Sequence, residues 1–409
     1  PDPMEAILAD FQRLIVPNLT QWNHPGFMAY FATTATGPGI LAELLTAALN
    51  PNGMLWTSSP AATELEQVTL DWLRQWMGLP EQFGIIFDTA STSTLHAIAA
   101  ARECADPEAR VRGASGSLVL YTSEQAHSSV EKGAIALGIG QANVRKIAVD
   151  DRLRMRAEAL EEAIERDRDA GRRPFCVVPT VGTTSSTAID PVAKIGEVAR
   201  RHNLWMHVDA AYAGTAAIVE EFRWVLEGAG EADSLVVNPH KWLGVPLDCS
   251  VLYTRRPDVL RRAFSLVPEY LRTSGDGVNY MDYGVPLGRR FRALKLWFVM
   301  RAFGREEIAA RIREHCEAAR EIGARIEASD RFTLCAPVTL SLVCFRANAS
   351  DADNQALLER VNASGDCFLS HTVLNGKFVL RMAIGNHATR REHVERAWAV
   401  VERTAAAGR

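Results

Sequence analysis

Short β-rich runs alternate with helix-like stretches between about Phe83 and Thr254, and this alternation constrains the fold more than any other feature of the sequence. The runs are FGIIFDTAS, LVLYTS, FCVVPTVGTT, LWMHVDAA, SLVVNPHKW and CSVLYT. Nearly continuous apolar strands separated by helices are typical of a mostly parallel sheet that is buried on both faces. The pattern therefore predicts an α/β domain with a mostly parallel central sheet.

Two of the connecting helices can be delimited from their end signals. One helix is expected from Met155 to Gly171, where a glycine and neighbouring arginines mark the end. The next is expected to begin at Asp190, a capping residue that is followed by Pro191 in the first turn. These signals predict helices on both sides of the FCVVPTVGTT run.

The pattern changes in the last third of the chain. The composition turns to Ser, Gly and Asp at residues 273–279, which predicts a mobile loop. A long helix-like segment at 306–328 then precedes the strands VTLSLVCFR and KFVLRMAI and a final helix from Arg391, as in an α+β domain. The chain is therefore expected to divide into an N-terminal arm (1–36), a large domain (37–293) and a small C-terminal domain (294–409).

Composition and charge exclude several classes of protein. The 409 residues are 47% hydrophobic, which is enough for a large core. Lys plus Arg number 45 against 49 for Asp plus Glu, without a basic block, so nucleic acid is not an expected partner. No apolar run approaches the eighteen or so residues that a membrane span needs. The seven cysteines are scattered and form no C-x-x-C pair, which favours a reducing cytoplasm.

Polar residues gather where the predicted strands end. In a parallel sheet the carboxyl ends of the strands share one edge, where loops present functional groups to a crevice. No carboxylate or cysteine is spaced to complete a metal site with His202 and His207, so no metal is expected. The residues at the strand ends are Ala90, Ser91, His127, Thr183, Thr184, Asp209, Asn238, His240 and Lys241.

Each of these residues has a structural explanation when it is taken alone. Lys241 could be a solvated loop charge, and His127 could be a buried histidine with satisfied hydrogen bonds. Asp209 lies in the apolar string HVDAAY, where a buried acid needs a cationic partner, and a structural ion pair would supply one. The combination is more specific, because hydroxyl, carboxylate and amine groups match a cofactor that carries a phosphate, a pyridine nitrogen and an aldehyde.

Seven strings resemble the group II pyridoxal-phosphate decarboxylases, and within that group the aromatic-L-amino-acid decarboxylases. The resemblance runs in order from about His24 to the final helix. It implies a type I aminotransferase-like fold, a homodimer with active sites at the interface, and conversion of an aromatic L-amino acid to an arylalkylamine and carbon dioxide. The strings are HPGFMAYFAT, SSPAATELE, SEQAHSSVEK, VGTT, HVDAAYAG, NPHKW and PLGRRFRALKLW.

The resemblance assigns roles around pyridoxal phosphate. Lys241 would hold the cofactor as a Schiff base, Asp209 would pair with its pyridine nitrogen, and His127 would lie over the ring face. Thr184 and Ala211 would border the ring. The phosphate would be held by Ala90, Ser91, Asn238 and His240, with Gly288 reaching the phosphate of the partner subunit.

Substrate contacts are also implied. Thr33 occupies the family position near the substrate carboxylate, together with Tyr30 and Trp56, although core packing explains the two aromatic residues equally well. Met54 stands in the pocket for the substrate ring, and His127 is expected to contact the substrate as well as the cofactor. Tyr270 matches the tyrosine that returns a proton to the substrate after decarboxylation.

Three alternatives to simple decarboxylation stay open. An aromatic aldehyde synthase would combine decarboxylation with oxidative deamination, and a transaminase or aldolase would use the same fold. Aldehyde synthases of this family have phenylalanine in place of the tyrosine or lack the stacking histidine, so Tyr270 and His127 favour the decarboxylase. A catalytically silent scaffold is the third alternative, and the intact set of Lys241, Asp209 and His127 argues against it.

Overall fold

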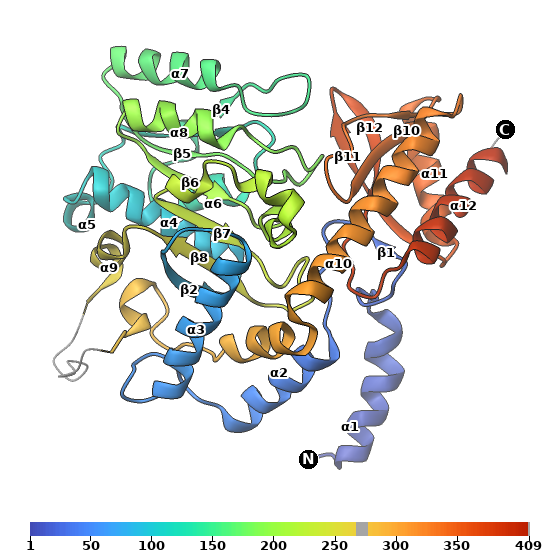
Figure 1. Ribbon diagram of the computed structural model, residues 1–409, viewed down its shortest axis with the longest axis horizontal. Coiled ribbons are helices and arrows are strands. Elements are labelled where there is room, and N and C mark those ends of the chain that lie inside the picture. Colours follow the sequence, from blue (N-terminus) through green and yellow to red (C-terminus); the bar gives the residue numbers. More distant parts are fainter. Residues whose placement is uncertain (267–276, 408–409) are drawn as a thin grey trace.

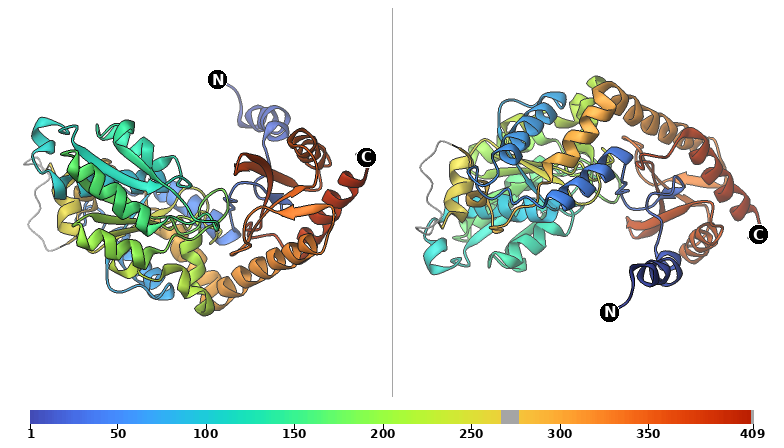
Figure 2. Two further views of the ribbon diagram at one scale, coloured as in Figure 1. Left: turned by 90° about the horizontal axis from the view of Figure 1, so that it is seen from above. Right: turned by 90° about the horizontal axis from the view of Figure 1, so that it is seen from below.

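Two lobes joined by a long helix make up the chain in its computed structural model, which describes residues 1–266 and 277–407 (Figure 1). The large lobe is built on a seven-stranded sheet with the strand order β2-β8-β7-β6-β5-β3-β4. The small lobe is built on a five-stranded sheet with the order β1-β11-β12-β10-β9. Figure 2 shows the lobes side by side in both views, with helix α10 running from one to the other.

The large sheet is mostly parallel, which confirms the predicted fold class. The pairs from β7 through β6, β5 and β3 to β4 are parallel, and β8 alone runs antiparallel to both of its neighbours. Each predicted apolar run contains one strand, whereas β4 was not expected because its sequence VRKI is half charged. The strands are β2 (Phe83–Phe87), β3 (Leu118–Ser123), β4 (Val144–Ile147), β5 (Arg173–Val178), β6 (Trp205–Asp209), β7 (Ser234–Val237) and β8 (Ser250–Thr254).

Both faces of the large sheet are buried under helices. On β3, Val119 and Tyr121 pack into one hydrophobic cluster while Leu118 and Leu120 pack into another. Because alternate residues of a strand point to opposite faces, these two clusters are the cores on the two sides. The helices of this lobe are α2 (Gly37–Leu49), α3 (Pro60–Trp76), α4 (Ala90–Ala105), α5 (Ala109–Arg112), α6 (Ser129–Ala136), α7 (Ala157–Asp169), α8 (Val192–Arg201) and α9 (Pro257–Phe264).

The predicted cap at Asp190 is wrong. Helix α8 begins at Val192 with Pro191 as its N-cap residue, and the cap makes no side-chain hydrogen bond. The Asp190 carboxylate instead accepts hydrogen bonds from the backbone N–H of Met155, at 2.7 Å, and of Thr180, at 2.8 Å. Burial raises the pKa of Asp190 to about 6. The aspartate therefore joins two connections of the large lobe instead of capping its own helix.

The small lobe contains the last part of the chain and one strand from its beginning. Strand β1 (Phe27–Met28) pairs in parallel with β11, so the N-terminal segment is bound to this lobe. Helix α10 breaks at Gly304, where φ is 69° and ψ is 169°. The predicted domain boundaries remain predictions. The remaining elements here are α1 (Met4–Asp10), α10 (Ala293–Glu327), β9 (Phe332–Leu334), β10 (Leu342–Ala347), α11 (Asp351–Ala363), β11 (Phe368–Leu374), β12 (Lys377–Ala383) and α12 (Arg391–Ala407).

Short helical turns complete the described chain. They are η1 (Phe11–Ile15), η2 (Val16–Asn18), η3 (Gln141–Asn143), η4 (Ala213–Ile218), η5 (Glu220–Leu226), η6 (Ala229–Glu231) and η8 (Tyr280–Tyr283). In residues 1–266 and 277–407, every helix is too short or too polar to cross a membrane. All seven cysteines are free thiols.

Candidate active site

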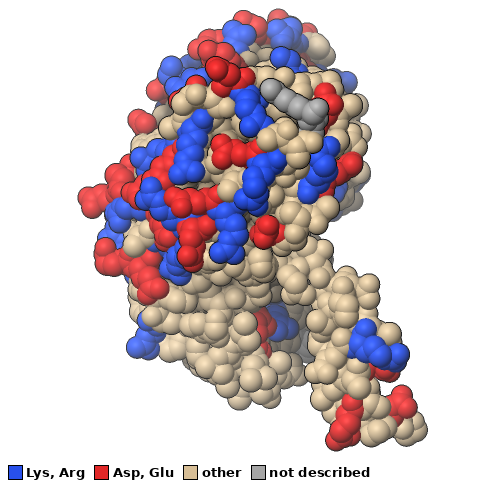
Figure 3. All heavy atoms as spheres, turned by 90° about the vertical axis from the view of Figure 1, so that its right-hand side faces the viewer, with Lys and Arg blue, Asp and Glu red and all other residues tan. Residues whose placement is uncertain are grey.

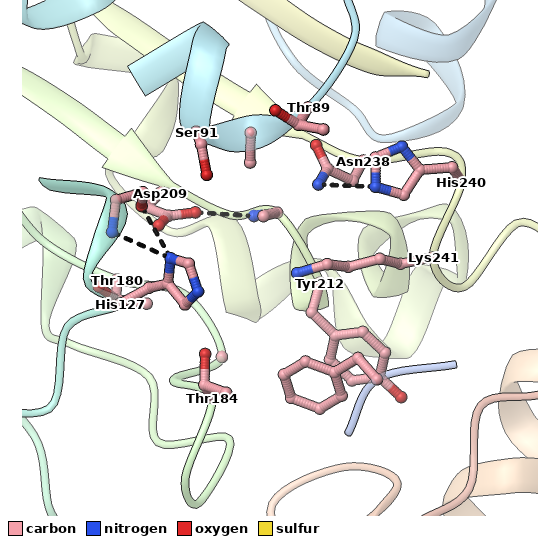
Figure 4. Close-up of a pocket in the computed structure, with 15 residues that line it drawn as sticks. Thr89, Ser91, His127, Thr180, Thr184, Asp209, Tyr212, Asn238, His240 and Lys241 are labelled. Carbon is pink, nitrogen blue, oxygen red and sulfur yellow. Dashed lines mark hydrogen bonds between the residues drawn. The ribbon is translucent and has the colours of Figure 1, made fainter. Parts of the chain in front are cut away.

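A cavity of about 190 Å³ lies at the carboxyl ends of β3, β5, β6 and β7. Its lining comes from the segments that follow these strands, from the first turn of α4 and from Phe31. Figure 4 shows the side chains of these segments pointing into one space. Nine residues that the sequence assigned to one site lie here together: Ala90, Ser91, His127, Thr184, Asp209, Ala211, Asn238, His240 and Lys241.

Asp209 is the last residue of β6, and its side chain is only 4% exposed. One carboxylate oxygen accepts a hydrogen bond from the backbone N–H of Ala211 at 3.2 Å. The backbone of Asp209 is fixed on both sides, because its N–H donates to Pro179 and its carbonyl accepts from Val181. The carboxylate is therefore held in the cavity wall in a defined direction.

Lys241 reaches the cavity from the segment that follows β7. Its Nζ lies 5.4 Å from the centre of the Phe31 ring. Burial lowers the pKa of Lys241, and the carboxylate of Asp209 opposes this effect. A lysine with a lowered pKa has a larger fraction of neutral amine, which is the form that attacks a carbonyl carbon.

His127 follows β3 on the other side of the cavity. Its Nδ1 lies 3.1 Å from the backbone nitrogen of Ser129 and 2.9 Å from the hydroxyl oxygen of the same residue. Burial lowers the pKa of His127, the charge of Asp209 raises it, and the charges of Lys241 and Lys132 lower it further. The net shift is downward, so the imidazole is mainly neutral at neutral pH.

The first turn of α4 forms the end of the cavity that suits an anion. Ala90 and Ser91 open the helix, and the hydroxyl of Thr89 caps it by accepting from the N–H of Thr92 at 3.4 Å. The free N–H groups of a first helical turn attract anions. The donors of this turn therefore favour a negatively charged group at this end.

Two further polar groups face the same end of the cavity. Nδ1 of His240 accepts from the backbone N–H of Cys249 at 2.9 Å, and the side-chain amide of Asn238 lies 3.2 Å from Nε2. Burial lowers the pKa of His240 to about 4, so the ring is neutral at neutral pH. His240 and Asn238 therefore add hydrogen-bonding groups without adding a positive charge.

Two aromatic rings of the lining, Phe31 and Tyr212, stack with a third ring outside it, Trp242. The ring of Tyr212 lies between those of Phe31 and Trp242, at centroid distances of 3.7 and 4.6 Å. Its hydroxyl is within 2.6 Å of the hydroxyl of Ser341 in the small lobe. The stack thus ties the N-terminal segment to the segment that carries Lys241 and gives the cavity an apolar surface.

The chain resembles known proteins over nearly its whole length. The pyridoxal-dependent decarboxylase conserved domain matches residues 1–348. The chain belongs to this family. It is 44% identical to the aromatic-L-amino-acid decarboxylase of Sus scrofa, over 97% of this chain and 85% of that protein. It is 40% identical to the phenylacetaldehyde synthase of Arabidopsis thaliana, over 99% of this chain and 86% of that one.

A solved structure of the same family has the same fold. The crystal structure of Oryza sativa TDC with PLP and tryptamine superposes with a TM-score of 0.95 at 37% identity, covering 100% of this chain and 89% of that one. Pyridoxal phosphate is the cofactor of these decarboxylases, and the cavity has the groups that it requires. Lys241 offers an amine for the aldehyde, Asp209 a carboxylate for the pyridine nitrogen, and the first turn of α4 donors for the phosphate.

Six residues that the sequence did not assign to the site also line this decarboxylase cavity. Thr89 precedes Ala90 and Ser91 as a capping threonine, and Tyr212 belongs to the HVDAAYAG string, so both had a local signal. The hydroxyl of Thr180 is buried and has no hydrogen-bond partner in the described part of the chain. The six are Phe31, Thr89, Ser129, Thr180, Gly182 and Tyr212.

Five other residues that the sequence assigned to the active site do not line this cavity. Gly288 borders a second cavity, next to Arg289 and Arg290, and Met54 lies nearby on the segment that hydrogen-bonds to Arg289 through Gly53. The other three members of this group are Trp56, Thr33 and Tyr30, of which Tyr30 is 53% exposed. Tyr270 lies outside the described residues.

Proposed function

We propose that this chain is a homodimeric enzyme that uses pyridoxal phosphate to decarboxylate an aromatic L-amino acid, releasing the arylalkylamine and carbon dioxide. One observation carries the proposal: the amine of Lys241 and the carboxylate of Asp209 face the same cavity from the ends of neighbouring strands, with His127 beside them. When bound, pyridoxal phosphate supplies an electron sink for the electron pair that remains on the α-carbon when carbon dioxide leaves.

The side chains of the cavity have distinct parts in this function. Lys241 anchors the cofactor through its amine, and its lowered pKa favours the neutral form that the bond requires. Asp209 keeps the pyridine nitrogen protonated, which strengthens the electron sink. His127, which lines the same cavity, would contact the cofactor ring and the substrate. Ala90, Ser91, Asn238 and His240 hold the phosphate, while Thr184 and Ala211 border the ring.

The choice of an aromatic substrate is supported by the walls of the cavity and by the relatives that act on aromatic amino acids. Phe31 offers a flat apolar face to the cavity, backed by Tyr212. Thr33 and Tyr30 belong to the same N-terminal segment, and we assign them to the substrate with Trp56 and Met54. A residue that binds the substrate carboxylate would fix the orientation of the substrate and so determine which bond at the α-carbon breaks.

Assembly into a homodimer is proposed because several assigned residues lie away from the cavity of their own protomer. Gly288, Met54 and Trp56 would then serve the active site of the partner subunit. Large exposed apolar side chains on α1 and α2 support such an interface, among them Leu8, at 54% exposure, and Leu44, at 65%. Figure 3 shows few charged side chains on the lower part of the molecule, which includes α2.

The dimer can be tested by light scattering. A mass near twice 44.9 kDa is expected for the parent protein. Leu44→Lys should weaken the dimer, because it places a charge on a surface that would be covered. Val111→Lys is the control, since Val111 is 81% exposed on the distant α5. An active monomer of the parent protein at assay concentration would contradict the proposal.

A cytoplasmic location is proposed on the state of the thiols. All seven cysteines are free, and five of them are buried. Such a set needs no oxidising compartment for folding. Fractionation of cells that express the full protein would test the location.

The reaction itself is tested by a product-resolved assay of the purified holoenzyme. Tryptophan, phenylalanine, tyrosine, dopa, histidine and glutamate are offered in parallel, and amine, aldehyde, ammonia and peroxide are measured. Amine from one or more aromatic substrates is expected. Aldehyde with peroxide would identify an aldehyde synthase instead, and no product with any substrate would favour a silent scaffold.

The anchor is tested in the same preparation by borohydride reduction and peptide mapping. Lys241 should carry the pyridoxyl group, and Lys241→Ala should lose both the label and turnover. Lys194→Ala is the matched control, because Lys194 is exposed on α8 and should be replaceable without effect. Labelling of Lys194 or Lys295 in the parent protein would overturn the assignment.

A further inference from the structure

The two ring nitrogens of His127 have different surroundings. Nδ1 faces the first residue of α6, where the backbone N–H of Ser129 donates to it at 3.1 Å and the Ser129 hydroxyl lies at 2.9 Å. The second nitrogen, Nε2, is on the opposite side of the ring and is turned toward the cavity (Figure 4). Ser129 itself is 2% exposed, so its contact with the ring is not shared with bulk solvent.

A backbone N–H can donate a hydrogen bond but cannot accept one. Nδ1 must therefore be the acceptor, which leaves it without a proton, and a neutral imidazole then has its proton on the other nitrogen. A proton on Nδ1 would instead point at the hydrogen of the backbone N–H of Ser129. We infer that Ser129 is a positioning residue that holds His127 as the tautomer protonated on Nε2, with that N–H directed into the cavity.

The charges around the ring are consistent with a neutral imidazole. The ionised groups that act on it are Asp209 at the end of β6, Lys241 after β7 and Lys132 on α6. Burial and the two lysines oppose protonation, and Asp209 alone favours it. Near neutral pH the ring therefore presents one hydrogen-bond donor to the cavity and carries no charge.

This tautomer limits the role of His127 in the proposed reaction. This part of the inference rests on the proposed function. A neutral imidazole N–H is a good hydrogen-bond donor and a very weak acid. His127 therefore orients an anionic group of the substrate through Nε2–H. The proton that takes the place of carbon dioxide on the α-carbon comes from another group, which agrees with the role that the family resemblance gives to Tyr270.

Neutron diffraction from deuterated holoenzyme crystals at neutral pH locates the proton directly. Deuterium on Nε2 and none on Nδ1 is the expected result for the parent protein. The same result is expected for Ser129→Ala, because the backbone donor remains. Deuterium on Nδ1, alone or together with Nε2, would overturn the inference. The measurement does not depend on turnover, so a failed decarboxylase assay and a wrong tautomer are distinguishable.

Ser129→Asp provides the opposite case. A negative charge is favoured in the first turn of a helix, and an ionised carboxylate at this position would attract a proton to Nδ1 more strongly than the remaining backbone N–H opposes it. Deuterium should therefore appear on Nδ1, and kcat/KM should fall by roughly tenfold or more if the substrate loses a hydrogen bond worth that factor. Ser128→Ala is the matched control, because Ser128 is exposed and makes no side-chain cap. Deuterium on Nδ1 together with an unchanged kcat/KM in Ser129→Asp would overturn the role of Nε2–H toward the substrate.

Discussion

The guanidinium of Arg381 in the small lobe donates a hydrogen bond of 2.6 Å to the carbonyl oxygen of Thr184 in the cavity wall. The same group donates to the carbonyl of Ser185 at 3.2 Å and to the hydroxyl of Ser370 at 2.8 Å. Arg381 is 2% exposed, and among residues 1–266 and 277–407 no carboxylate acts on its pKa, which burial lowers. The buried guanidinium of Arg381 thus holds the loop that carries Thr184 and Ser185, in the large lobe, against the small lobe.

Replacement of Arg381 should weaken the attachment of this loop to the small lobe. In Arg381→Lys, one ammonium cannot reach all three acceptors, and buried carbonyl groups lose their donors. We expect a loss of about 2–4 kcal/mol in the free energy of unfolding, by the usual values for hydrogen bonds to charged groups. Affinity for pyridoxal phosphate should fall as well, because Thr184 borders the cavity.

Urea unfolding and titration with pyridoxal phosphate measure both effects. Arg325→Lys serves as the control, because the side chain of Arg325 is 47% exposed and only meets Glu395 on the surface. That control should change stability by less than about 0.5 kcal/mol. If the two variants had the same unfolding free energy and the same affinity for pyridoxal phosphate, Arg381 would not hold the loop in place.

Asp209→Asn tests the carboxylate with little change of shape. The amide can still accept from the N–H of Ala211, so the local backbone should be retained. It cannot keep a pyridine nitrogen protonated, and turnover should fall by roughly a thousandfold or more, as for other groups that organise charge in a site. Asp258→Asn, on the surface of α9, should have no effect. Near-normal turnover of Asp209→Asn at full cofactor occupancy would rule the role out.

The sequence located most of the cavity because its residues follow buried strands. Asp209, His127 and Lys241 each stand just after an apolar run, and parallel strands bring their carboxyl ends to one edge. Local patterns carry no comparable information on distant contacts. Arg381 and Thr184 are 197 positions apart, and nothing near either residue indicates the other.

The wrong prediction at Asp190 has a similar origin. An aspartate before a proline is typical of a helix start. The local sequence does not show that the carboxylate of Asp190 accepts hydrogen bonds from the backbone N–H groups of Met155 and Thr180 instead of capping the helix. The strand β1 was missed because a two-residue strand has no periodicity to detect. Its partner β11 lies in the last part of the chain, where Phe368 pairs with Phe27 and the two rings stack at 5.7 Å.

Tyr270→Phe tests the source of the returning proton. Tyr270 lies outside the described residues, so the expectation rests on the sequence. The variant should still bind the cofactor and release carbon dioxide, while its product shifts from amine toward aldehyde. One oxygen molecule and one water are consumed for each aldehyde, with ammonia and hydrogen peroxide released. The ratio of aldehyde to amine, measured under air and under argon, tests this expectation. Amine alone at the parent rate would mean that another group supplies the proton.

The buried carboxyl of Asp190 should make stability depend on pH. Its pKa is about 6 in the folded chain and near the ordinary value of 3.8 in the unfolded chain, because burial disfavours the charged form. Between these values the folded protein binds more protons than the unfolded one, so stability falls as pH rises. The contribution is fully present below pH 3.8 and is lost as pH rises through 6. The loss is about 3 kcal/mol, from the usual 1.36 kcal/mol for each pKa unit.

Asp190→Asn isolates this contribution, because an amide does not ionise in this range. The variant should lose one of the two backbone hydrogen bonds at every pH, since its NH2 group cannot accept from an N–H. The unfolding free energy of the parent minus that of the variant should therefore be largest near pH 4 and should fall by up to about 3 kcal/mol toward pH 6.5. Urea unfolding at half-unit steps of pH measures that difference. A difference that stays constant over this range would mean that Asp190 remains ionised in the folded protein, held by its two backbone donors more strongly than burial opposes.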